Sequence, residues 1–171
     1  INVPVHLGLE HYPNIYCGVA VFLLYPLYVM DKDINLCEKI GKSVLLLVFL
    51  TAFNLNIPNF IWHGFHYPNS LPCRQSFIYI FFLLTMCYEA LSHIKRMTSR
   101  QLGIAVWISL GLLVLIEQVF AVDETYDFKA IYLSGAFILV YAGLMIVYNK
   151  TNWKLPVTVF LAFIVLSLIH I

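Results

Sequence analysis

The sequence predicts an all-α protein, a polytopic bundle of about six transmembrane helices that forms a single domain over residues 1–171. Of these residues 61% are hydrophobic and only 11% are charged, and the mean hydropathy is +0.85. A soluble domain is about 25% charged, so this composition indicates an integral membrane protein. The apolar runs are continuous rather than alternating, which favours spanning helices over a barrel of strands.

Six apolar runs, delimited by charged and turn-forming residues, predict the spanning helices. Each run approaches the roughly 20 residues that cross a hydrocarbon core of ~30 Å. The predicted helices are residues 14–30, 43–60, 76–92, 102–121, 130–148 and 155–171. The chain begins with Ile1 rather than methionine and is still apolar at Ile171. We therefore expect a fragment of a longer membrane protein.

The charges in the segments that follow the runs predict the orientation of the protein in the membrane. Several cations follow the first, third and fifth runs, whereas a single cation follows the second and the fourth. The first group is Lys32, Lys39, Lys42, Lys95, Arg96, Arg100, Lys150 and Lys154, and the second is Arg74 and Lys129. Because cation-rich segments are retained in the cytoplasm, residues 1–13 and 59–75 are predicted to be external in a multi-pass protein.

Charge and cysteine usage narrow the function classes. The net charge is +1, and the cations lie at helix ends rather than in a basic patch, which argues against a nucleic-acid partner. The four cysteines show no metal-binding spacing. The sequence thus indicates no cofactor and no metal site, and it leaves a need for a divalent cation undetermined.

Residues 59–77 form the most polar stretch between two apolar runs, and Arg74 is its most informative residue. An external arginine opposes the charge bias, and a guanidinium at a helix start suits a lipid phosphate. Amides from Ser76 onward would add a favourable helix dipole for an anion. The alternative is a snorkelling arginine, or an internal ion pair with Glu117.

The same stretch holds two histidines, His63 and His66, which are three positions apart in the sequence. On a helical turn both rings would share a face, but no third ligand is evident, so a metal site is not predicted. Hydrogen bonding to a polar substrate or to the backbone is favoured, and Asn69 adds another polar group to this set.

Two carboxylates fall inside spanning runs, where charges are costly and suggest function. Glu89 lies near the cytoplasmic end with His93 four residues later, which favours a structural pair. Glu117 lies deeper and is predicted to line an external cavity. Asn14 and Tyr16, at the start of the first run, are placed at the same cavity.

Two segments of the chain resemble a known family. The stretch NFIWHGFHYPNSLPCRQSF, residues 59–77, resembles the signature loop of the bacterial YfhO family of multi-spanning membrane proteins. The stretch YPNIYCG, residues 12–18, looks like the helix start PN-x-Y-x-G of that family. The alternation of helices and loops agrees over nearly all of the chain.

The resemblance implies a function, because members of this family are similar to GT-C glycosyltransferases. It implies transfer of a sugar from an undecaprenyl-phosphate carrier to a cell-envelope polymer such as lipoteichoic acid, in the bacterial cytoplasmic membrane. On that expectation Arg74, His63 and His66 would contact the carrier phosphate or the sugar, with membrane lipid around them. The catalytic acid would lie in a loop upstream of Ile1, so no catalytic residue is assigned here.

The alternative from another class is a transporter or permease, in which the external loop gates a pathway and Glu89 or Glu117 serves as a coupling group. Hydropathy fits both classes equally. A transporter concentrates polar groups at the midplane, whereas a lipid-linked transferase gathers them in one external cavity. The predicted distribution favours the transferase.

Overall fold

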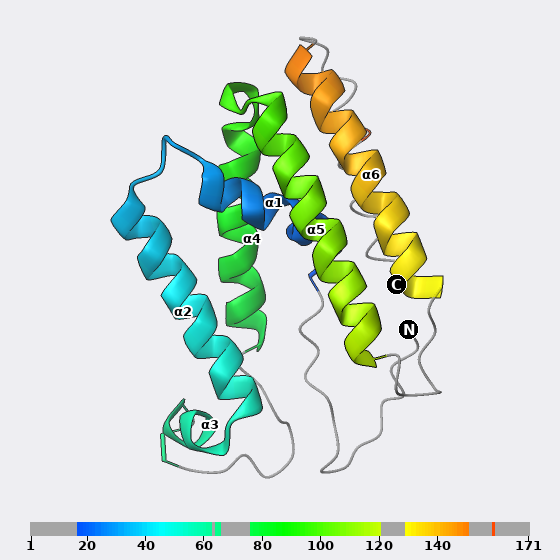
Figure 1. Cartoon of the computed structure of the whole chain (residues 1–171). Coiled ribbons are helices and arrows are strands. Elements are labelled where there is room, and N and C mark those ends of the chain that lie inside the picture. Colours follow the sequence, from blue (N-terminus) through cyan, green and yellow to red (C-terminus); the bar gives the residue numbers. More distant parts are fainter. Residues whose placement is uncertain (1–16, 63, 66–75, 121–128, 151–158, 160–171) are drawn as a thin grey trace. The chain divides into compact units, whose positions relative to one another are not determined.

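The computed structural model describes residues 17–62, 64–65, 76–120, 129–150 and 159, and every regular element in these ranges is a helix (Figure 1). This confirms the predicted all-α class for the described part of the chain. The elements are α1 (Ala20–Met30), α2 (Leu36–Asn54), α3 (Asn56–Trp62), α4 (Ser76–Ser92), the 3₁₀ turn η1 (Ile94–Arg96), α5 (Ser99–Phe120) and α6 (Lys129–Lys150).

The sequence suggested one domain, and the structure has two compact units. Unit 1 contains α2, α3 and the part of α4 up to Thr85. Unit 2 contains α1, the rest of α4 from Met86, η1, α5 and α6.

Two of the described helices are long and apolar enough to cross a membrane, α5 over Ser99–Gln118 and α6 over Ile131–Lys150. The apolar helices α1 and α4 are shorter. The predicted number of six spans therefore stays a prediction. The sixth predicted span, residues 155–171, lies outside the described residues except for position 159.

Helix α1 is shorter than predicted, because it begins at Ala20 rather than at residue 14. Gly18 has a φ of 90°, a left-handed backbone through which a right-handed helix cannot continue. Residues 14–16 lie outside the described part.

Helix α1 also contains Pro26. Proline has no N–H, so the Phe22 carbonyl, four residues earlier, loses its usual donor. The hydroxyl of Ser109 on α5 donates to this carbonyl at 2.6 Å, and Ser109 is fully buried. A side chain from another helix thus supplies the hydrogen bond that the proline removes.

Unit 2 is built around this pairing, because α1 packs on both α5 and α6, which also pack on each other (Figure 1). Leu23 and Leu27 of α1 and Ile138 and Tyr141 of α6 are fully buried. Helix α5 begins three residues before the predicted residue 102. There Thr98 and Gln101 cap each other: the Thr98 amide donates to Gln101 Oε1 at 2.8 Å, and the Gln101 amide donates to Thr98 Oγ1 at 3.3 Å.

Helix α2 of unit 1 differs from the predicted run 43–60 at both ends. It begins at Leu36, because Asn35 caps it by accepting the Cys37 amide at 3.1 Å, and Glu38 and Lys42 form an ion pair one turn apart. The charged residues Glu38 and Lys42, which precede the predicted run, therefore lie inside the helix.

Helix α2 ends at Asn54 and a separate helix, α3, begins at Asn56. Pro58 explains the break, because in a continuous helix its ring would clash with the Asn54 carbonyl. Proline also has no N–H that could donate a hydrogen bond to this carbonyl. Leu55, between the two helices, has extended dihedral angles of −112° and 134°. The prediction of one continuous helix over residues 43–60 was therefore wrong.

Aromatic side chains hold unit 1 together. The Phe49 ring lies edge-on to Trp62 at 4.8 Å and to Tyr79 at 6.4 Å between centroids, and Phe53 meets Tyr79 at 5.5 Å. These contacts join α2, α3 and α4. Such edge-to-face pairs add about 0.5–1.5 kcal/mol each beyond their buried area. Helix α4 itself covers Ser76–Ser92, the predicted range.

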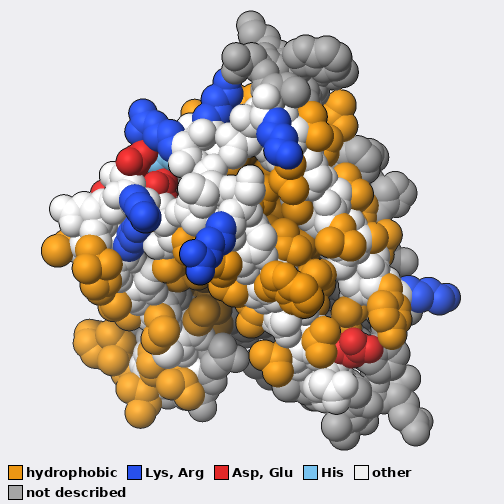
Figure 2. Space-filling view, turned by 45° about the horizontal axis from the view of Figure 1, so that its top comes forward, with side chains coloured by type: hydrophobic (Ala, Val, Ile, Leu, Met, Phe, Trp, Pro, Cys, Tyr) orange, Lys and Arg blue, Asp and Glu red, His pale blue; other side chains and the backbone are white. Residues whose placement is uncertain are grey.

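Many large apolar side chains are exposed, as the hydrophobic surface in Figure 2 shows. On α5 the exposed fractions of Trp107 and Leu115 are 78% and 62%, and on α2 that of Leu47 is 61%. A soluble protein rarely exposes contiguous apolar surface on this scale. Contact with lipid explains it without a cost in free energy.

Candidate functional site

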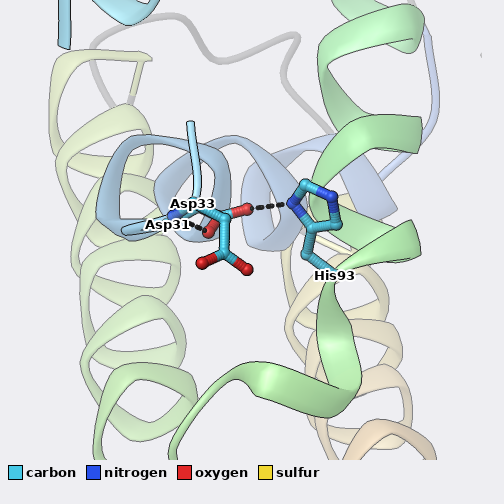
Figure 3. A group of neighbouring side chains, drawn as sticks. All are labelled: Asp31, Asp33 and His93. Atoms are coloured by element: carbon cyan, nitrogen blue, oxygen red, sulfur yellow. Dashed lines mark hydrogen bonds and ion pairs between the residues drawn. The ribbon is translucent and has the colours of Figure 1, made fainter. Parts of the chain in front are cut away.

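The densest group of polar side chains in unit 2 joins the segment after α1 to the end of α4. Asp31 is buried, with its side chain 5% exposed. Its Oδ1 accepts the Asp33 amide at 2.9 Å, and its Oδ2 lies 2.7 Å from Nδ1 of His93 (Figure 3). At that distance from a carboxylate Nδ1 carries a proton. The buried charge of Asp31 is thereby satisfied, as burial requires.

An ion pair lies beside this hydrogen bond and is exposed. Nη1 of Arg96 donates to Oδ2 of Asp33 at 2.7 Å. This hydrogen bond lowers the pKa of Asp33 below its ordinary value and raises that of Arg96. Because both side chains are exposed to solvent, the pair orients the segment more than it stabilises the fold.

Asp31, Asp33 and His93 also offer three ligand atoms that lie within 4.8 Å of one another. Two carboxylates and one imidazole suit a divalent cation. However, Arg96 already neutralises Asp33, and the His93 ring holds Asp31. An incoming cation would have to displace both partners, so the arrangement is better explained as a hydrogen bond and an ion pair that tie the segment after α1 to the segment after α4.

Asp31 and Asp33 were not among the predicted site residues. The sequence predicted that His93 pairs with Glu89, whereas the His93 ring bonds Asp31 and the Glu89 carbonyl accepts the His93 amide at 3.3 Å. A signal was present, since Asp31 and Asp33 flank Lys32 in a segment otherwise rich in cations. Two carboxylates so close together need partners, although spacing alone does not identify them.

Hydrogen bonds gather the helix ends around this group. Nε2 of Gln101 donates to the Met30 carbonyl at 2.9 Å, and Nδ2 of Asn149 donates to the Met97 carbonyl at 2.8 Å. Nζ of Lys95 lies 5.0 Å above the Tyr148 ring. The last residues of α1 and α6 and the first of α5 therefore lie at one end of unit 2. The cations at this end are Lys32, Lys95, Arg96, Arg100 and Lys150.

The opposite end of α5 and α6 carries Glu117. Its Oε1 accepts a hydrogen bond from the Tyr132 hydroxyl at 3.2 Å, and Glu117 is half-buried. Since Asn149 and Met97 meet at one end and Tyr132 and Glu117 at the other, α5 and α6 run antiparallel. Unit 2 thus has a cation-rich end, which also holds Asp31 and Asp33, and an opposite end with Glu117 and Lys129.

A comparison with protein families decides what kind of membrane protein this is. A family model described as "Bacterial membrane protein YfhO" matches residues 6–171. The chain belongs to the YfhO family. No curated protein matched the chain. No solved structure matched it either.

The family membership confirms the resemblance seen in the sequence, and the structure describes part of the predicted YfhO-family site. Ser76 is the first residue of α4 and is half-buried, and Glu117 lies near the end of α5 with Tyr132 as a partner. The other predicted site residues lie outside the described residues: Asn14, Tyr16, His63, His66, Asn69 and Arg74. Their roles stay predictions.

Proposed function

We propose that this YfhO-family chain forms the membrane-embedded part of a glycosyltransferase. It would bind an undecaprenyl-phosphate-linked sugar at the external face of the membrane, for transfer to a cell-envelope polymer such as lipoteichoic acid. The proposal is supported by the membership in a bacterial membrane protein family. The resemblance drawn from the sequence, of that family to GT-C enzymes, suggests the reaction.

The separation of charge along unit 2 is the observation that carries the proposal furthest. The cation-rich end with Lys32, Arg96 and Lys150 has the character of a cytoplasmic face. Glu117 and Tyr132 lie at the other end of the α5–α6 pair. In this proposal that end faces the external side, and the half-buried Glu117 would line a cavity for a polar headgroup.

Ser76 opens α4, which has 17 residues and is therefore about 25 Å long. The N-terminal amides of a helix attract anions, so this start offers donors to a phosphate. Arg74, two residues earlier, would add a guanidinium with two parallel donors. In this proposal His63, His66 and Asn69 hydrogen-bond the phosphate or the sugar.

The proposed reaction needs a catalytic base, and no residue of this chain is assigned to that role. The acceptor hydroxyl would attack the anomeric carbon and lose its proton to a carboxylate. The bond from that carbon to the phosphate oxygen would break, and the carrier phosphate would leave with its pair of electrons. Arg74 and the α4 amides would stabilise the charge that grows on the leaving phosphate.

The test uses the full-length protein in membranes that are supplied with undecaprenyl-phosphate-linked sugars. Arg74→Ala should abolish transfer while membrane insertion is retained, and His63→Ala and His66→Ala should cause smaller losses. Lys42→Ala is the matched control, because Lys42 forms a surface pair within α2.

Transfer at the wild-type rate by a well-inserted Arg74→Ala protein would refute the role of this loop. If the wild type transfers none of several sugars to any of several acceptors, the glycosyltransferase proposal itself is refuted.

A further inference from the structure

One face of α5 is exposed along its whole length and ends in polar groups. Arg100 lies at one end of this face and Gln118 at the other, 18 residues apart. At 1.5 Å per residue this separation is about 27 Å, close to the ~30 Å of a hydrocarbon core. The exposed residues between them at helical spacing are Gly103, Ile104, Trp107, Gly111, Val114 and Leu115.

The Trp107 indole projects from the middle of this face, between two glycines. Trp107 is 78% exposed, and Gly103 and Gly111 lie one turn before and one turn after it. A Cβ added at either glycine would meet no atom within 4 Å. The face therefore has room for a flexible chain that runs along the helix axis against the indole.

Three cations lie at the Arg100 end of this face. The bond of Gln101 to the Met30 carbonyl places Lys32 and Arg100 at one end of unit 2, and the bond of Asn149 to the Met97 carbonyl places Lys150 at the same end. Lys32, Arg100 and Lys150 are exposed, and none of them forms an ion pair with another described residue. Arg96 differs, because Asp33 neutralises it.

We infer that this end of unit 2 binds the headgroup of an anionic phospholipid, whose acyl chain lies on the α5 face along Gly103, Trp107 and Gly111. The phosphate pairs with Arg100, and Lys32 and Lys150 add to the positive potential. Exposed cations of this kind favour anionic over zwitterionic lipids, by about 1 kcal/mol each near a membrane surface, which corresponds to about five-fold per cation.

This inference is independent of the proposed transferase site. The lipid site lies at the end of α5 that is remote from Glu117. It uses none of the residues assigned to the sugar carrier. Loss of one function therefore does not predict loss of the other.

The test measures quenching of Trp107 by lipids that carry bromine on their acyl chains. Full-length protein is placed in phosphatidylcholine vesicles that contain a minor fraction of either brominated phosphatidylglycerol or brominated phosphatidylcholine. The difference in emission between wild type and Trp107→Phe isolates this indole from the other tryptophans.

In the wild type, brominated phosphatidylglycerol should quench Trp107 more than its share of the lipid predicts. Arg100→Gln should lower the preference for phosphatidylglycerol about five-fold. Lys129→Gln is the control, because it removes the same charge at the start of α6, at the opposite end of the helix pair. Gly111→Leu should reduce quenching by both lipids, since its side chain would lie one turn from Trp107 and screen the indole from the acyl chain.

Equal quenching by the two brominated lipids in the wild type would overturn the inference, because the face would then contact bulk lipid without selection. Absence of quenching by either lipid would also overturn it, because a second copy of the chain or another helix would then cover the face.

Discussion

Ser109→Ala provides the sharpest test of how unit 2 is held together. The Ser109 hydroxyl is fully buried and lies 2.6 Å from the Phe22 carbonyl and 2.7 Å from the Ala105 carbonyl. A hydroxyl has one proton to share between these two acceptors. The Ala105 carbonyl also lies within α5, four residues before Ser109, where the Ser109 amide is its usual donor. The loss therefore falls mainly on Phe22.

The expected cost follows from the environment of that carbonyl. A buried acceptor that loses its partner costs about 1–3 kcal/mol, whereas hydrogen bonds between membrane helices average about 0.6 kcal/mol and reach about 1.7. Exchange of serine for alanine removes one oxygen and leaves little cavity. We therefore expect Ser109→Ala to lower the free energy of unfolding by about 1–1.5 kcal/mol.

Pro26→Ala turns this expectation into a double-mutant cycle. Alanine restores the N–H that can donate to the Phe22 carbonyl within α1. In that background Ser109→Ala should cost less than about 0.5 kcal/mol, and the lost packing of the proline ring cancels between the two arms of the cycle.

The assay is equilibrium unfolding of the full-length protein in mixed micelles, followed by helical circular dichroism. Ser92→Ala is the matched control, because its hydroxyl bonds the Glu89 carbonyl of its own helix at 2.7 Å on an exposed surface. Its effect should stay within about 0.5 kcal/mol. An equal cost of Ser109→Ala with and without Pro26 would refute the reasoning, because the two residues would then be uncoupled.

Two further predictions concern the cation-rich end of unit 2. Because Arg96 lowers the pKa of Asp33, the pair contributes stability that is present above the unfolded-state pKa of about 3.9 and is lost as the pH falls through the lower folded value. Arg96→Gln should therefore flatten the acid limb of stability against pH in unfolding measurements, and an unchanged limb would contradict the pairing. Asn149→Ala should destabilise by about 1 kcal/mol, because it removes the donor to the Met97 carbonyl. Asn149→Asp should lower the free energy of unfolding further at neutral pH, since a carboxylate cannot donate a hydrogen bond to the carbonyl. A larger loss for Asn149→Ala than for Asn149→Asp in the same assay would exclude this bond.

Sequence reasoning succeeded where a local signal sufficed. The apolar run 76–92 is bounded by polar residues, and α4 occupies Ser76–Ser92. The helical class followed from composition, because lipid leaves the backbone few ways to satisfy its hydrogen bonds. The starts of α2 and α5 were missed, because apolarity marks the edge of the hydrocarbon and the capping residues Asn35 and Thr98 mark the edge of the helix.

The two prolines show why the remaining features needed the structure. Pro58 follows the break after α2, whereas Pro26 is tolerated inside α1. The sequence around a proline does not distinguish these outcomes, because the deciding group for Pro26 is Ser109, far along the chain. The pairing of Asp31 with His93 is equally non-local.

The distant partners of α1 have a consequence for the order in which the protein is assembled. The Phe22 carbonyl lies 87 residues before its partner Ser109 in the sequence, and the Asp31 carboxylate lies 62 residues before its partner His93. At about 5–20 residues per second, synthesis of α1 precedes these partners by roughly 4–17 s and 3–12 s. During that interval α1 carries polar groups that lipid cannot satisfy. With a ribosome stalled between Met30 and Ser109, α1 would therefore stay associated with the insertion machinery, and the arrival of α5 would release it into the membrane.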